Sequence, residues 1–209
     1  MKLLIILNLI YLINASRILY YDDIEEEISD SNFLWTKTDI TWRLNNYTLK
    51  LNYSDVYYTV DKAFRQWESI SIFKFSYTNV NPDIELYFVN QKDHKFREGV
   101  LAHAKYPHKD KSFIHFNDDV DWSLTVKKGV SLYYVVLHEI GHSLGLTHNL
   151  DDDSIMYPVY VEKGDDYNLK DGPIDYVLIK ELYIDLERKL FFGPSTTRQT
   201  TTSTTITLR

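Results

Sequence analysis

Three histidines and one glutamate stand at a spacing that can hold a metal ion. His138 and His142 are four residues apart, so on a helix they face the same side and can bind one cation. Glu139 lies one step round that helix, near the ion and able to act on a water molecule. Gly145 allows the helix to stop and the chain to turn, which brings in His148 as a third ligand. Three neutral imidazoles leave a fourth position open, as in a catalytic zinc site.

The chain contains no cysteine, which excludes disulfides, thiolate metal sites and cysteine nucleophiles together. A metal site must therefore use histidine and carboxylate side chains, and the sequence has seven histidines. With 23 Lys and Arg against 30 Asp and Glu, the formal charge is -7, so we expect no nucleic-acid partner, because such binding needs a basic surface. A hydrophobic content of 44% over 209 residues is enough for one domain with a packed core.

The metal motif needs a helix to carry it and a sheet to support that helix. Apolar residues at helical spacing predict helices over about 131–144 and 174–190, and a third from a Ser54 cap through Trp67. Short segments rich in aromatic and β-branched residues predict strands, which fall at 40–44, 72–77, 84–89, 100–104 and 113–116. This order predicts one domain of the α/β or α+β class.

The extended metal motif resembles that of the metzincin metallopeptidases. Residues 154–160 resemble their Met-turn in its matrixin form, which places Met156 beneath the zinc. Segments outside the motif also resemble matrix metalloproteinase catalytic domains. These segments are 34–37, 40–44, 63–67, 101–104, 115–116, Trp122 and 182–183. The resemblance covers about 33–184. It implies an α+β (α/β-like) metzincin fold, with a twisted five-stranded, mostly parallel sheet, three helices and a zinc cleft above the Met-turn.

The resemblance implies a secreted zinc-dependent endopeptidase that hydrolyses peptide bonds of extracellular or matrix proteins. Glu139 would activate the zinc-bound water as general base and pass the proton to the leaving amine. The alternative is a catalytically silent binding or decoy protein on a metzincin scaffold. Such decoys typically lose this glutamate or a zinc ligand, and the intact set in this sequence favours the enzyme.

The resemblance also implies a substrate cleft. Substrate would lie antiparallel to the edge strand at 100–104, which includes Ala102. Pro158 and Tyr160 match the wall of the pocket for the residue just after the cut, and Tyr134 matches the floor of that pocket. A bulky tyrosine at the floor predicts a shallow pocket that prefers medium apolar side chains such as leucine.

A second, structural zinc is a further implication of the resemblance. His103 and His115 match two of its histidine ligands, and His94 can stand for the third. The aspartate that the family carries two positions later is Phe96 here, and Asp93 is a candidate substitute. The alternative is that these are ordinary strand and loop histidines.

Calcium is another candidate ion. Asp83 keeps one position at which the family binds calcium, whereas Asn117 and Val120 stand where the family usually has carboxylates. Because Ca²⁺ takes six or more oxygen ligands, the two replacements weaken that second site. The aspartates at 151–153 are better explained as a solvated loop.

The ends of the chain predict processing and location. Residues 1–16 carry one positive charge, a mainly apolar run and small residues, which predicts a signal peptide; a buried N-terminal helix or strand is the alternative. We then expect a short acidic leader at 17–32, the metallopeptidase catalytic domain at 33–192 and a Thr-rich disordered tail at 193–209. The mature protein is expected to be an extracellular monomer with no transmembrane segment.

Control of activity is expected to differ from the family pattern. Matrixins are normally held latent by a prodomain cysteine in the fourth zinc position. The leader at 17–32 is short and the chain has no cysteine, which predicts an enzyme secreted in active form. A second hypothesis is that a carboxylate from residues 22–30 reaches the zinc instead.

Overall fold

The computed structural model of the protein describes residues 19–21 and 33–192. The predicted signal peptide, the acidic residues 22–30 and the Thr-rich tail lie outside the described residues. The predictions for those segments therefore stay predictions.

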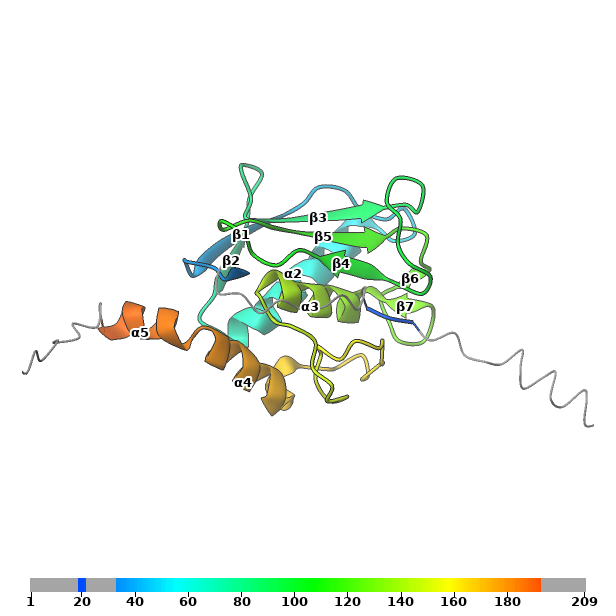
Figure 1. Cartoon of the computed structure of the whole chain (residues 1–209). Helices are drawn as coiled ribbons and strands as arrows, with labels where there is room; N and C mark the ends of the chain where they lie inside the picture. Colours follow the sequence, from blue (N-terminus) through cyan, green and yellow to red (C-terminus); the bar gives the residue numbers. More distant parts are fainter. Residues whose placement is uncertain (1–18, 22–32, 193–209) are drawn as a thin grey trace, which may run out of the picture.

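Five strands form one sheet in the order β2-β1-β3-β5-β4 (Figure 1). Neighbouring strands pair in parallel except at the edge, where β4 runs antiparallel to β5. A separate parallel pair, β6 and β7, lies directly before the central helix. The expected five-stranded, mostly parallel sheet is thus confirmed. The strands are β1 (Asp39–Leu44), β2 (Lys74–Tyr77), β3 (Ile84–Val89), β4 (Ala102–Ala104), β5 (Ser112–Asn117), β6 (Trp122–Ser123) and β7 (Val130–Ser131).

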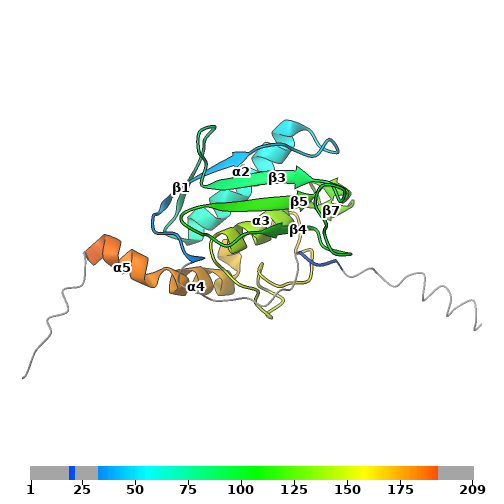
Figure 2. The ribbon, with the colours of Figure 1, turned by 45° about the horizontal axis from the view of Figure 1, so that its top comes forward.

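Two helices, α2 (Tyr53–Ile70) and α3 (Leu132–Ser143), lie beside each other on one side of the sheet (Figures 1 and 2). The expected Ser54 cap is wrong, because α2 begins at Tyr53 and its cap position is Asn52, two residues earlier, whose side chain makes no capping hydrogen bond. Helix α2 buries one apolar stripe, whereas all 12 residues of α3 are buried. A helix that is covered all round lies in the middle of the core, and α3 is the helix that carries the metal motif.

The last predicted helix is divided in two by the structure. After the short 3₁₀ helix η2 (Leu169–Asp171), helix α4 (Pro173–Leu182) ends at Tyr183, and helix α5 (Ile184–Phe192) follows. The described residues therefore form four α-helices where three were expected. Figures 1 and 2 both show α5 extending away from the rest of the domain.

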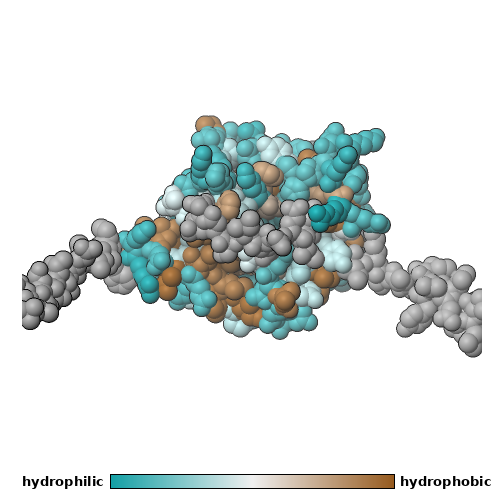
Figure 3. All heavy atoms as spheres, viewed as in Figure 1, coloured by the Kyte–Doolittle hydropathy of each residue, from teal (hydrophilic) through white to brown (hydrophobic). Residues whose placement is uncertain are grey.

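Within residues 19–21 and 33–192, no helix is both long and apolar enough to cross a bilayer. In Figure 3 apolar residues gather on the lower part of the molecule, where Figure 1 places α4. Tyr176 and Val177 of that helix are exposed.

Candidate metal centre

The structure brings His138, His142 and His148 together around one point. Their candidate ligand nitrogens all lie within 4.8 Å of one another. The ring centroid of His138 is 4.7 Å from that of His142 and 5.3 Å from that of His148, and the latter two are 4.8 Å apart. The first two are buried on α3, and the third follows the helix after a turn. The spacing in the sequence therefore corresponds to a real cluster.

Hydrogen bonds fix the way in which two of the rings face the cluster. The Nδ1 atom of His138 lies 2.7 Å from the carbonyl oxygen of Ile155, and that of His142 lies 2.7 Å from the carbonyl oxygen of Leu146. Because a carbonyl only accepts, both Nδ1 atoms carry hydrogen, and both Nε2 atoms present lone pairs. This arrangement is the usual one behind metal-ligating histidines.

The approach of those lone pairs fits a bound cation. The Nε2 atoms of His138 and His142 are 3.0 Å apart. Two lone pairs at that distance repel each other unless a positive charge lies between them. Zinc bound tetrahedrally at about 2.05 Å from each nitrogen would place them roughly 3.3 Å apart. The residues present therefore fit zinc.

A sharp turn brings His148 to the site. Gly145 ends α3 with φ of +88°, a left-handed conformation that favours glycine. The amide of Leu146 then donates to the carbonyl of Gly141 at 3.0 Å. The indole of Trp35 donates to the carbonyl of Ser143 at 2.8 Å, and so satisfies one of the carbonyls that a helix end leaves without a helical partner.

Met156 lies where the Met-turn was expected, beneath the helix that carries the cluster. It is fully buried, and a Cβ atom placed on Gly141 would lie only 2.3 Å from its sulfur. Glycine at this position of α3 thus allows the thioether to pack directly against the helix backbone. The close approach supports the floor of the metal centre.

A residue that the sequence did not single out holds this turn in place. Asp175 of α4 is fully buried, and it accepts hydrogen bonds from the Ser154 hydroxyl at 2.6 Å and the Ile155 amide at 3.0 Å. Burial raises the pKa of this carboxyl, and the Ser154 hydrogen bond opposes that rise. The carbonyl of Ile155 is the group that orients His138. The available signal was one aspartate four residues before the buried Ile179 on an otherwise apolar helix face.

The structure also places the remaining residues of the expected cleft. Glu139 follows His138 on α3 and is buried. Tyr134 is buried one turn earlier; its hydroxyl donates to the carbonyl of Gly164, and burial raises its pKa to about 12. The hydroxyl of Tyr160 accepts a hydrogen bond from the Ser131 amide at 2.9 Å.

Tyr21, near the start of the described residues, makes backbone hydrogen bonds both to the expected pocket wall and to the edge strand β4. The carbonyl of Pro158 accepts from the Tyr21 amide at 3.1 Å, and the amide of Ala102 donates to the Tyr21 carbonyl at 2.9 Å. The two sides of the expected cleft therefore face each other across that residue.

The three histidines of the expected structural zinc site also meet. Candidate ligand nitrogens of His94, His103 and His115 lie within 4.8 Å of one another. His103 of β4 and His115 of β5 are direct partners in the antiparallel register, so strand pairing places them together. Burial, followed by the neighbouring His94, lowers the pKa of His115 to about 4.

A fourth ligand does not complete this second cluster in the described residues. Phe96 is buried, with its ring centroid 4.7 Å from that of His94 and 5.5 Å from that of His103. The carboxylate of Asp93 accepts instead from the side-chain amide of Asn90 at 2.7 Å, and it is not among the clustered ligands. The suggested substitution by Asp93 is not seen in this arrangement.

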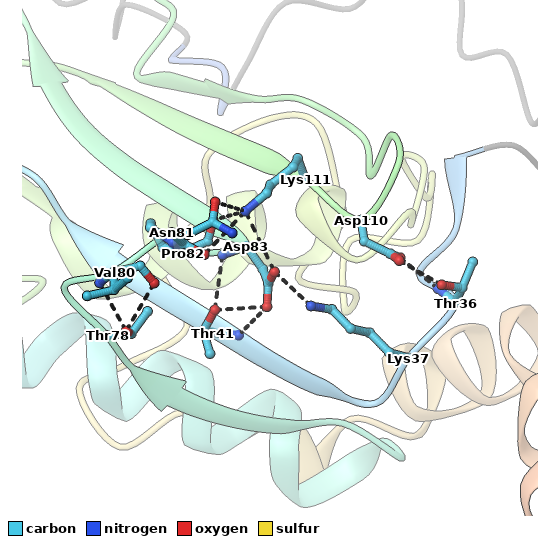
Figure 4. Close-up of polar contacts among 10 residues, drawn as sticks. All are labelled: Thr36, Lys37, Thr41, Thr78, Val80, Asn81, Pro82, Asp83, Asp110 and Lys111. Carbon is cyan, nitrogen blue, oxygen red and sulfur yellow. Dashed lines mark hydrogen bonds and ion pairs between the residues drawn. The ribbon is translucent and has the colours of Figure 1, made fainter.

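The candidate calcium position at Asp83 is filled by protein donors. The Lys37 ammonium lies 2.7 Å from one carboxylate oxygen, and the amide and hydroxyl of Thr41 each donate to the other at 2.8 Å. Lys111 approaches to 3.9 Å, and Figure 4 shows both lysines directed at the carboxylate. These contacts lower the pKa of Asp83 against the effect of its burial. A lysine therefore supplies the positive charge that calcium would supply.

Comparison with known proteins agrees with this geometry. The sequence profile of the family described as Matrixin matches residues 34–184. Macrophage metalloelastase of Oryctolagus cuniculus is 37% identical over 134 residues, which make up 61% of this chain and 29% of that protein. Interstitial collagenase of Sus scrofa is 36% identical over 152 residues, or 69% of this chain and 32% of the collagenase. The chain thus spans about a third of the length of these relatives.

The sheet, the buried helix and the three-histidine cluster are the arrangement of a metzincin-type zinc site. The chain belongs to the matrixin family. Members of this family are zinc metalloendopeptidases that also use calcium and a second, structural zinc.

Proposed function

We propose that this chain is a secreted, monomeric endopeptidase that uses zinc to hydrolyse peptide bonds of extracellular or matrix proteins. The observation that carries the proposal is the convergence of His138, His142 and His148 beside the buried Glu139. Relatives named as a metalloelastase and an interstitial collagenase support a substrate drawn from matrix proteins.

Each polar residue of the centre has a distinct role in this proposal. His138, His142 and His148 would hold the zinc, which would lower the pKa of a bound water and polarise the peptide carbonyl. Glu139 accepts a proton from the attacking water and delivers it to the leaving amine. The carbonyls of Ile155 and Leu146 hold His138 and His142 in the tautomer that offers Nε2 as a ligand.

Substrate lies between the edge strand and the wall segment. Backbone groups around Ala102 pair with the extended peptide, and Pro158 and Tyr160 line the pocket for the residue after the cut. Tyr134 lies at the floor of that pocket, where its hydroxyl is bonded to the carbonyl of Gly164. The pocket therefore has aromatic side chains at both its wall and its floor.

The alternative, a silent binding protein, is not favoured. Loss of catalysis on this scaffold would be expected to leave a change among Glu139 and the three histidine ligands. All four residues are present, and three of them converge in ligand geometry.

The domain organisation stays as the sequence predicts it. We assign residues 1–16 to a signal peptide, 17–32 to a leader, 33–192 to the catalytic domain and 193–209 to a Thr-rich tail. The family match over 34–184 supports the limits of the catalytic domain. The composition of 1–16 supports secretion.

Glu139→Gln tests the proposal directly. We expect cleavage of a peptide with a Gly-Leu bond to fall roughly a thousandfold, because the general base is lost while the ligand set is intact. The measurements are the hydrolysis rate and the zinc content of the same preparation. Glu181→Gln is the matched control, since Glu181 is exposed on α4. A wild-type chain that holds zinc and cleaves no faster than Glu139→Gln would support the binding protein instead.

A further inference from the structure

A polar cluster lies at the amino ends of three strands of the sheet. Strands β1, β3 and β5 are neighbours and run parallel to one another. The segments that lead into them, 36–38, 81–83 and 108–111, meet at this end of the sheet, as Figure 4 shows. We call this the strand-entry cluster, and its members are Thr36, Lys37, Thr41, Asn81, Pro82, Asp83, Asp110 and Lys111.

The ammonium nitrogen of Lys111 is surrounded by oxygen atoms of residues 81–83. It donates to the carbonyl oxygen of Pro82 at 2.6 Å, and to the side-chain and carbonyl oxygens of Asn81 at 2.9 and 3.3 Å. A carboxylate oxygen of Asp83 lies 3.9 Å away. Backbone carbonyls, amide oxygens and carboxylates are the ligands that Ca²⁺ takes in proteins. The lysine thus places its own cation within a set of oxygens of the kind that calcium binds.

Lys37 brings a second positive charge to the same carboxylate. Its ammonium is 2.7 Å from the Asp83 oxygen that Lys111 also approaches, and the other oxygen accepts from the amide and hydroxyl of Thr41. The side chain of Asp83 is only 8% exposed. Together the two ammonium groups carry the formal charge of one calcium ion. Because like charges repel each other, a divalent cation is disfavoured beside both lysines.

The cluster also holds backbone of unusual conformation. Asn81, Lys109 and Asp110 have φ of +46°, +52° and +54°, in the left-handed region that costs free energy outside glycine. Lys111 bonds both oxygens of Asn81, and Asp110 accepts from the amide and hydroxyl of Thr36 at 2.9 and 2.7 Å. The cluster therefore joins the loop before β5 to the turn before β3 and to the segment before β1.

We infer that the Lys111 ammonium, together with Lys37, is a tethered cation that replaces calcium at the amino ends of β1, β3 and β5. A bound ion stabilises the fold only as far as its concentration exceeds its Kd, whereas a lysine is present at any calcium concentration. This end of the sheet is therefore stable without calcium, although the family uses that ion. The inference goes beyond the proposed function, because it concerns the cation that joins the strands and not the cleavage reaction.

Neutralisation of Lys111 in the full chain is the first test. Lys111→Met keeps the length of the side chain and removes the charge. We expect the melting temperature to fall by roughly 3 °C, equally in calcium and in EGTA, because the lysine is half exposed. Lys170→Met is the matched control, since Lys170 is exposed on η2. An unchanged melting temperature, or a calcium response of wild type that Lys111→Met abolishes, would overturn the inference.

Charge reversal at the same position is the second test. Lys111→Asp adds a carboxylate to the oxygens of 81–83, and we expect about one calcium ion per chain more than in wild type. Equilibrium dialysis counts the ions, and calcium should raise the melting temperature of this variant by roughly 5 °C more than that of wild type. The comparison with wild type removes the contribution of any other calcium site. An ion count and a calcium response equal to those of Lys170→Asp would show that residues 81–83 are not a cation site, and would overturn the inference.

Hydrogen exchange tests where the effect lies. The Asp83 amide donates to the carbonyl of Thr41, and the Ser112 amide donates to the carbonyl of Asp83, both at 2.9 Å. We expect both amides to exchange roughly tenfold faster in Lys111→Met, and calcium to slow them again in Lys111→Asp. The amides of α3 should be unchanged in both variants. Equal acceleration of the α3 amides, or no acceleration at Asp83 and Ser112, would contradict a local cation at the strand-entry cluster.

Discussion

The two clusters of three histidines lie on opposite faces of the sheet and are built differently. His138 and His142 come from the buried helix α3, on the face that packs against β4 and β5. His115 alternates along β5 with the buried Ile114 and Phe116, so its side chain points to the other face. One cluster is therefore set in the core and the other under a surface loop.

The structures around the two clusters also differ. In the first cluster, carbonyls fix the rings of His138 and His142, and the turn that supplies one carbonyl is held by the buried Asp175. In the second, strand register places His103 opposite His115, and a loop adds the third histidine. Helix spacing and a supported turn give a deep, rigid site, whereas register and a loop give a shallower one.

The two clusters differ most clearly in the group that lies beside the three histidines. Beside the first cluster lies Glu139, a group that can handle protons. Beside the second lies the ring of Phe96, which offers no ligand and no proton. Three converging histidines therefore do not define a role; the group next to them does. We therefore assign chemistry to the first cluster and stability to the second.

Breaking the second cluster should have the largest effect on stability. His115→Ala removes one ligand, and we expect the zinc-loaded protein to lose about 3–4 kcal/mol of unfolding free energy, as for loss of an ion present at about a thousand times its Kd. Denaturant melts with and without zinc measure the change. His108→Ala is the control, because His108 is exposed. An equal stabilisation of wild type and His115→Ala by zinc would show that this cluster binds none.

Breaking the support of the first cluster should have a smaller effect on stability and a local effect on metal binding. Asp175→Ala leaves the Ser154 hydroxyl and the Ile155 amide without their buried acceptor, and we expect a loss of about 2–3 kcal/mol. Zinc should also bind less tightly to His138 and its partners, with the second cluster unaffected. Asp185→Ala on the exposed start of α5 is the control. Equal weakening of both clusters would contradict the local role of Asp175.

Completing the second cluster should have the smallest effect. Phe96→Asp restores a carboxylate two positions after His94, and we expect zinc to bind that cluster roughly tenfold more tightly. The gain is limited because a buried ring is lost. Competition with a coloured chelator measures the affinity. An unchanged or weaker affinity would show that Phe96 does not stand in the fourth ligand position.

The sequence predicted the parts of the molecule that follow from local spacing. The helix motif predicted the first cluster, and the aromatic and β-branched residues in 84–89 and 113–116 predicted two strands, which the structure pairs with each other. Asp175 was missed because its role depends on a contact with a turn some twenty residues earlier, which no local pattern shows.

The sequence was less informative where one polar contact replaces another. Asp83 was given as a candidate calcium position, and the sequence gave no sign that Lys37 and Thr41 bond its two carboxylate oxygens. The pairing of Tyr20 with Val100 and Val159 was not predicted, because the composition of the leader gives no sign of it. Long-range pairing of this kind appears only in the folded chain.

The most direct test of the account separates the two clusters in one experiment. The variant His138→Ala/His142→Ala and the variant His103→Ala/His115→Ala are compared for zinc content and for peptide cleavage. We predict that each retains about one zinc ion per chain, and that only the second variant cleaves the peptide. Cleavage by the first variant, or a folded second variant that holds zinc but cannot cleave, would contradict the assignment of chemistry to His138, His142 and His148.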